Sequence, residues 1–223
     1  PSKDDIDQGG LGDCGTMSTL GAIAKTNPNK IRQTVVDLGD GTYAAQFFSG
    51  GSKVFVRVDG DLATWAAGNG AQSSTWVRVM EKAFATFRSN TYASVASRWM
   101  SDVFTDLGAT NITSHWSWSS GTDLLNKIAT ELAAGKAVTV STDASGITGT
   151  CPCVANHAYM VERVNYTAVY LWGVGFVNIA TSVTLRNPWG TDGAGNDGSN
   201  DGYVTVTAAE ANDNFTAVMS GNV

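Results

Sequence analysis

Helical and strand periodicities occupy different halves of this chain, and this segregation constrains its fold more than any other feature. Apolar residues recur at helical spacing from Trp76 to Phe87, and further helical patterns cover residues 13–25 and 122–134. Beyond residue 135, short apolar runs bounded by Gly, Asn and Asp dominate. Helices followed by strands are typical of an α+β fold. We therefore predict two lobes, a helix-rich one at residues 1–110 and a β-rich one at residues 111–223.

Strand patterns are short, and Gly-containing turns separate several of them. We expect strands at residues 42–48, 53–58, 137–142, 157–164, 168–174, 182–187, 203–207 and 215–219.

The composition excludes several classes of partner. The net charge is −6 and 15% of the residues are charged, without a Lys/Arg cluster, so binding to nucleic acid or to an anionic membrane is not expected. No apolar run approaches the roughly 20 residues of a membrane span. The chain begins Pro-Ser-Lys without a Met. We therefore expect flanking domains of a longer chain, and assign no compartment.

Three cysteines make an odd count, and one of them occupies an unusual place. Cys151 and Cys153 are one residue closer than the C-x-x-C spacing of redox and zinc motifs, which disfavours a metal or redox role for the pair. Cys14 follows a Gly-rich acidic run and begins a predicted helix for which Asp13 is the expected N-cap. A helix N-terminus favours a thiolate, so Cys14 is the candidate nucleophile.

A nucleophilic thiol needs a base, and the chain offers only two histidines. His115 lies in a polar aromatic stretch, where a surface or packing role is expected. His157 begins a predicted strand. Asn187 ends another predicted strand, and its side-chain amide could orient an imidazole. The order Cys, His, Asn along the chain is that of papain-like proteases.

The short sequence motifs around these three residues resemble those of one protein family. Residues 8–14 read QGGLGDC, residues 156–159 read NHAY and residues 186–190 read RNPWG. They are similar to the Q-G-x-L-G-D-C, G-H-A-Y and R-N-P-W-G motifs of the calpain protease core. The likeness continues in MEKAFA at residues 80–85 and VRVDGDL at residues 56–62, and it covers nearly the whole chain.

The resemblance implies a papain-like two-lobed fold with the active site in the cleft, and a role for each matching residue. Cys14 would be the nucleophile, His157 its base and Asn187 the residue that orients the imidazole. Trp189 would cover that contact. Gln8 would donate its side-chain amide to the oxyanion beside the Cys14 backbone N–H, and one such donor typically lowers the barrier by about 3 kcal/mol.

The chain departs from the family at three places. Gly15 stands where the family has Trp, which bears on the shape of the pocket. Asn156 stands where it has Gly, and the Asn side chain could narrow the cleft beside His157. Ser74 replaces an acidic ligand of the calcium site in the first lobe, to which Asp5 would contribute.

A second calcium site is conceivable in the Gly/Asp/Asn run after residue 190, although such runs are also ordinary turns. Its candidate ligands are Asp192, Asp197 and Asp201.

The sequence therefore predicts a cysteine endopeptidase that acts on proteins or peptides through a thioester acyl-enzyme, requires no cofactor for its chemistry and is open to modulation by Ca²⁺. Two alternatives remain open. One is a catalytically silent binding or scaffold module of calpain type. The other is a self-processing protease domain of a larger protein.

Overall fold

A computed structural model describes residues 1–62, 74–194 and 198–223 of the chain. In the first part, three consecutive strands stand between two groups of helices: η1 (Lys3–Asp5), α1 (Cys14–Thr26), α2 (Pro28–Thr34), β1 (Val35–Asp37), β2 (Thr42–Ser49), β3 (Ser52–Asp59), α3 (Thr75–Arg88), η2 (Tyr92–Val95) and α4 (Met100–Asp106). The rest is richer in strands: β4 (Thr110–His115), α5 (Gly121–Ala133), β5 (Ala137–Thr142), β6 (Ala158–Leu171), β7 (Gly175–Arg186), β8 (Tyr203–Thr207), α6 (Ala208–Asn214) and β9 (Phe215–Asn222).

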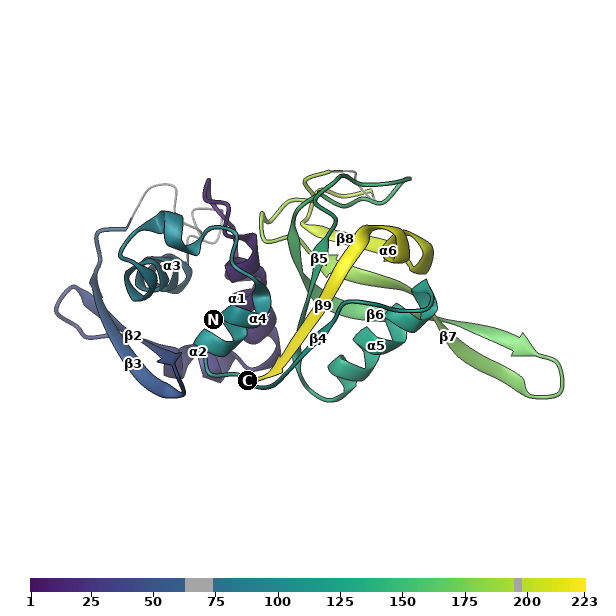
Figure 1. Ribbon diagram of the computed structural model, residues 1–223, viewed down its shortest axis with the longest axis horizontal. Helices are drawn as coiled ribbons and strands as arrows, with labels where there is room; N and C mark the ends of the chain where they lie inside the picture. The colour runs from purple at the N-terminus through teal and green to yellow at the C-terminus, as the bar shows by residue number, and fades with distance from the viewer. Residues whose placement is uncertain (63–73, 195–197) are drawn as a thin grey trace.

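Two antiparallel sheets organise these elements. The small sheet has the order β1-β2-β3, and the large one has the order β4-β9-β5-β6-β7-β8 (Figure 1). Helices and sheets are thus both present in quantity, which confirms the predicted α+β class.

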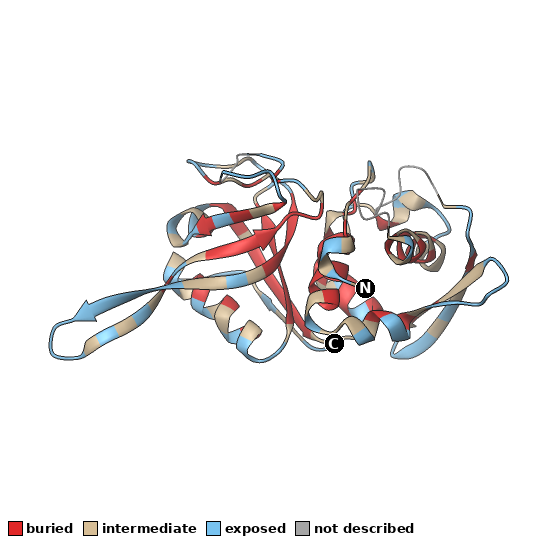
Figure 2. Cartoon of the chain, turned by 180° about the vertical axis from the view of Figure 1, so that it is seen from behind, coloured by how far each residue is buried: buried red, intermediate tan, exposed pale blue. Residues whose placement is uncertain are grey.

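The large sheet is apolar on both faces, and each face meets a different core. In the central strand β5, Ala137 belongs to the core that contains α1 and α3, while Val138 and Val140 belong to the core that contains α5 and α6. Alternation of side chains along a strand produces this division. Figure 2 shows the buried residues of the sheet between the two groups of helices.

Packing of α1 on this sheet positions the site. Small residues on the helix allow the approach: a Cβ built on Gly21 would lie 3.5 Å from the Met160 sulfur of β6. The first turn of α1 therefore lies beside the first residues of β6.

Most predicted elements are present, and some boundaries were wrong. The predicted helices correspond to α1, α3 and α5, and β5 and β8 have the predicted bounds. The strand predicted at 168–174 is wrong, because the chain reverses at Trp172 and Gly173, where the Val174 N–H donates to the Leu171 carbonyl at 3.0 Å. The prediction missed α2, α4, β4 and α6.

Candidate active site

A cavity of about 680 Å³ lies where the start of α1 meets the large sheet. The residues that line it include Gln8, Cys14, His157 and Trp189. Positions far apart in the sequence, each selected as a candidate site residue, therefore meet at one cavity.

Cys14 is the first residue of α1 and is the free cysteine of the three. Burial raises the pKa of its thiol above the ordinary value of 9.0, and the neighbouring Asp13 carboxyl adds to the rise, while the Ala158 backbone N–H opposes it. The expectation that the helix N-terminus favours the thiolate is thus outweighed here by desolvation.

Asp13 occupies the N-cap position, but its side chain makes no capping hydrogen bond. It is fully buried, and burial together with the neighbouring Glu81 carboxyl raises its pKa well above the ordinary value. Its predicted capping role was wrong, because the carboxyl turns into the core of the first lobe.

His157 immediately precedes β6, and Asn187 immediately follows β7, the strand paired with β6. Their side chains form a hydrogen bond of 2.9 Å between His157 Nε2 and Asn187 Oδ1. Because an amide oxygen only accepts, Nε2 carries the proton. Nδ1 is then the unprotonated nitrogen of the neutral ring. Burial lowers the pKa of His157 below 6.5, and the bond to Asn187 partly offsets this.

The Asn187 side chain is completely buried and held by backbone groups. Its Nδ2 donates to the Asp192 carbonyl at 3.1 Å, and its Oδ1 also accepts from the Trp189 N–H at 3.0 Å. Both ends of the amide are thereby fixed, so that the oxygen faces His157. The Trp189 ring lies 4.6 Å from the imidazole, centroid to centroid, so it packs beside the base as the predicted cover would.

Gly193 allows this arrangement, although its role was not foreseen in the sequence. Its φ is +83°, and a Cβ there would lie 2.9 Å from Asn187 Nδ2 and 2.9 Å from the Trp189 ring. The Gly/Asp/Asn run after residue 190 was the available signal, and it suggested calcium instead of close packing.

Gln8 is buried at the cavity edge, where its backbone N–H donates to the Pro188 carbonyl at 2.7 Å. Its side-chain Nε2 donates to the Leu11 carbonyl. An amide nitrogen has two hydrogens. One Nε2 hydrogen therefore remains beyond the bond to Leu11, and Gln8 is among the residues that line the cavity.

Two of the three departures from the family, at Gly15 and Asn156, have explanations in the backbone. A Cβ on Gly15 would lie 2.1 Å from the Arg98 carbonyl oxygen, so the segment before α4 fills the space that a side chain would need. Asn156 has a φ of +50°, a conformation that Gly adopts freely and that Asn tolerates better than most residues. Asn156 also lines the cavity, as expected.

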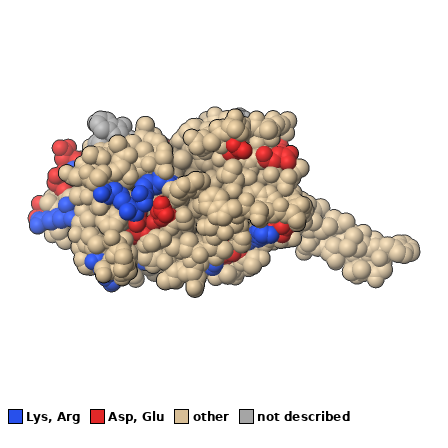
Figure 3. All heavy atoms as spheres, viewed as in Figure 1, with Lys and Arg blue, Asp and Glu red and all other residues tan. Residues whose placement is uncertain are grey.

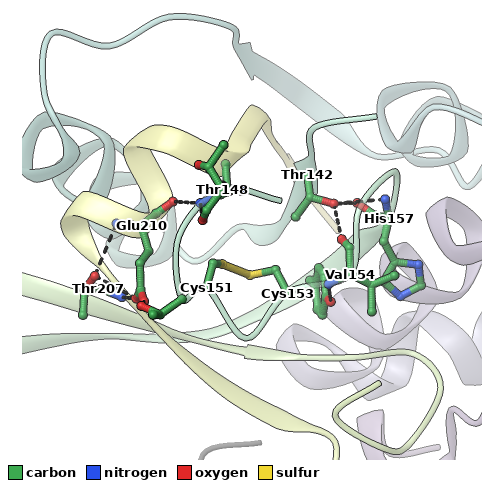
Figure 4. The surroundings of a disulfide bond; sticks show 11 residues. Thr142, Thr148, Cys151, Cys153, Val154, His157, Thr207 and Glu210 are labelled. Carbon is green, nitrogen blue, oxygen red and sulfur yellow. Dashed lines mark hydrogen bonds between the residues drawn. A yellow bond between two sulfur atoms is a disulfide. The ribbon is translucent and has the colours of Figure 1, made fainter. Parts of the chain in front are cut away.

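Cys151 and Cys153 form a disulfide, a pairing that the sequence did not predict (Figure 4). The following residues lead directly to the site. Thr142 Oγ1 donates to the Val154 carbonyl at 2.6 Å and accepts from the His157 N–H at 3.0 Å. The disulfide loop and the candidate base are therefore attached to the same strand residue.

The described candidate calcium ligands accept hydrogen bonds from groups of the protein itself. Asp5 accepts hydrogen bonds from the Trp76 indole and the Ser2 N–H, and Asp201 accepts from Ser199 and Tyr203. Asp192 is buried and accepts from the Gly202 N–H, while Asp197 lies outside the described residues. Across 1–62, 74–194 and 198–223, no three His, Cys, Asp or Glu side chains are grouped as metal ligands.

His115 ends β4, where its Nε2 lies 3.0 Å from Glu131 Oε1 of α5. This contact fits the packing role expected for it.

Comparison with known proteins supports the motif-based resemblance. The model of the calpain family of cysteine proteases matches residues 1–212. No curated protein matches the chain significantly. Since the family match covers nearly the whole sequence, the chain belongs to the calpain family of cysteine proteases.

Proposed function

We propose that the chain is a cysteine endopeptidase that hydrolyses peptide bonds through Cys14, His157 and Asn187. The observation that carries the proposal is the fixed hydrogen bond from His157 Nε2 to Asn187 Oδ1 at 2.9 Å, in the cavity that Cys14 also lines. This bond leaves Nδ1 free to accept a proton. Protein or peptide substrates follow from the family.

The proposed reaction begins at the Cys14 sulfur. Nδ1 of His157 takes the proton from Cys14 Sγ as the sulfur attacks the carbonyl carbon. The oxyanion receives hydrogen bonds from the Cys14 N–H and the second Gln8 Nε2 hydrogen. The imidazolium then gives its proton to the leaving amine, and a water molecule activated by His157 hydrolyses the thioester.

Digestion of a peptide library tests this function directly. The native protein should cleave, whereas Cys14→Ala and His157→Ala should lose at least about 10³-fold in kcat/KM. Alkylation of native Cys14 by iodoacetamide should abolish cleavage as well. Intact peptides with the native protein would favour a silent scaffold, and cleavage confined to a longer form of the chain would favour self-processing.

Calcium remains a prediction that the same digestion can test. Parallel reactions with EDTA and with added Ca²⁺ separate a calcium-dependent enzyme from an independent one. No step above requires the ion.

A further inference from the structure

The paired strands β6 and β7 extend beyond the large sheet as a two-stranded arm, which we define as residues 166–180 (Figures 1 and 2). β5 pairs with β6 only up to Met160, and β8 pairs with β7 only from Ser182. Among the residues that the structure describes, the arm therefore has no third strand on either edge.

The tip of the arm exposes large apolar side chains. Trp172 is 93% exposed, Phe176 77% and Val174 73%. Soluble proteins seldom present a contiguous group of this kind without a partner.

Both faces of the arm are apolar, as the strand register shows. Tyr170 lies opposite Phe176 on one face, with 5.3 Å between ring centroids. Val169 lies opposite Val177 on the other face. A flat protein partner would cover one face and leave the other in water. An environment that surrounds the tip would cover both.

The arm also lacks charge: residues 164–185 include no Asp, Glu, Lys, Arg or His. Figure 3 shows the projecting arm free of charged atoms, in contrast to the body. Lys and Arg would be required to attract anionic headgroups. Trp and Tyr favour the boundary between headgroups and acyl chains. We propose that the tip of the arm inserts into the interface of a phospholipid bilayer with uncharged, zwitterionic headgroups.

A second copy of the chain fits these observations less well. Six residue pairs from Tyr166–Ala180 to Leu171–Gly175 form the arm, so it is about 20 Å long and about 10 Å wide. One face then offers on the order of 200 Å², and two faces together reach about half of the roughly 800 Å² that each partner contributes to a standard interface.

Open strand edges also limit how deep the arm can enter. Unpaired backbone groups are costly in hydrocarbon. Only the turn and the residues next to it therefore enter the bilayer, while the tyrosines stay near the headgroups. No described helix is long and apolar enough to span a membrane, so the inferred contact is interfacial.

Flotation with phosphatidylcholine vesicles tests the inference on the whole chain. The native protein should float, and the variant Trp172→Ser/Val174→Ser/Phe176→Ser should show at least a tenfold smaller partition coefficient. A matched control, Val36→Ser/Leu38→Ser/Phe55→Ser, removes similarly exposed side chains from the first lobe and should float like the native protein. Equal thermal unfolding midpoints would show that the arm variant is folded.

Three further measurements discriminate the outcomes. Acyl-brominated lipid should quench fluorescence of the native protein more than that of Trp172→Phe. Anionic lipid should not increase binding, because the net charge is −6. Failure of the native protein to float, or equal loss in both triple variants, would overturn the proposal. A lipid-free dimer in sedimentation velocity that the arm variant abolishes would assign the arm to a second copy instead. None of these readouts depends on peptidase activity.

Discussion

Gly15 shows how one missing side chain shapes the candidate site. The Arg98 carbonyl occupies the position where its Cβ would be, and Ser97 donates its N–H to the Gly12 carbonyl at 2.9 Å. The segment before α4 is thus held against the first turn of α1, where it lines the cavity beside Cys14. A Trp at position 15 would require this segment to move.

Gly15→Ala should therefore lower the free energy of unfolding by about 1–3 kcal/mol, because the backbone of Arg98 must shift. Chemical denaturation measures this loss. Gly12→Ala is the matched control, since a Cβ there would meet nothing within 4 Å. Equal stability of the two variants would show that the contact yields without cost.

The lowered pKa of His157 predicts the acid side of the pH profile. Burial disfavours the imidazolium, so the ring stays neutral, and able to accept a proton, as the pH falls through the ordinary value of 6.5. The decline of kcat/KM in acid should have its midpoint below pH 6.5. A pH series of peptide hydrolysis measures it, and a midpoint above 6.5 would contradict the assignment of His157 as a buried neutral base.

At the scale of elements, the disulfide belongs to one wall of the cavity. Val154, Ala155 and Asn156 line the cavity and follow Cys153 directly. The disulfide closes so short a loop that its entropic contribution to the free energy of unfolding is only about 1.5 kcal/mol. Its principal effect is to restrict the segment that leads to His157.

Cys151→Ser/Cys153→Ser should thus raise KM several-fold while it lowers the free energy of unfolding by no more than about 2 kcal/mol. Peptide kinetics and denaturation, carried out in parallel, separate the two effects. The prediction fails if KM is unchanged, which would show that the wall is held by Thr142 alone.

Elements with a strong periodic pattern could be predicted from the sequence. The stripe from Trp76 to Phe87 corresponds to α3 because one face of that helix is fully buried. β4 was missed because Ser, Thr and Asn dominate it and mainly Ile112 packs on the core. The arm was divided wrongly because it is apolar on both faces, and alternation cannot reveal a turn there.

The candidate triad could be predicted because its residues lie in distinctive motifs at element ends. The contacts that hold the triad residues in place could not be predicted, since they involve backbone atoms distant in the sequence. The Asp192 carbonyl on Asn187 and the Arg98 carbonyl on Gly15 leave no mark on hydrophobic patterning. Likewise, the fate of Asp13 depends on burial beside Glu81, whereas its sequence position indicated a cap.

At the scale of the whole molecule, the two cores share one sheet. Ala158 and Met160 of β6 face the first core, and Tyr159 and Val161 face the second. Because both cores pack on the same strands, disruption of one core also removes support from the strands that form the other core.

We accordingly expect a single cooperative thermal transition, with an enthalpy of about 150 kcal/mol near 60 °C. Differential scanning calorimetry measures it, and the calorimetric and van't Hoff enthalpies should agree. Two resolved transitions would instead indicate that the lobes unfold independently.

The three cysteines place opposite demands on the surroundings. In the proposed reaction Cys14 must be reduced to attack a carbonyl, whereas Cys151 and Cys153 restrain the cavity wall only while oxidised. A strongly reducing solution keeps the Cys14 thiol reduced but also reduces the Cys151–Cys153 disulfide. A strongly oxidising solution preserves the disulfide but oxidises the Cys14 thiol. If the proposed reaction takes place, its rate should therefore pass through a maximum as the glutathione ratio is varied, and the ambient redox potential would control it.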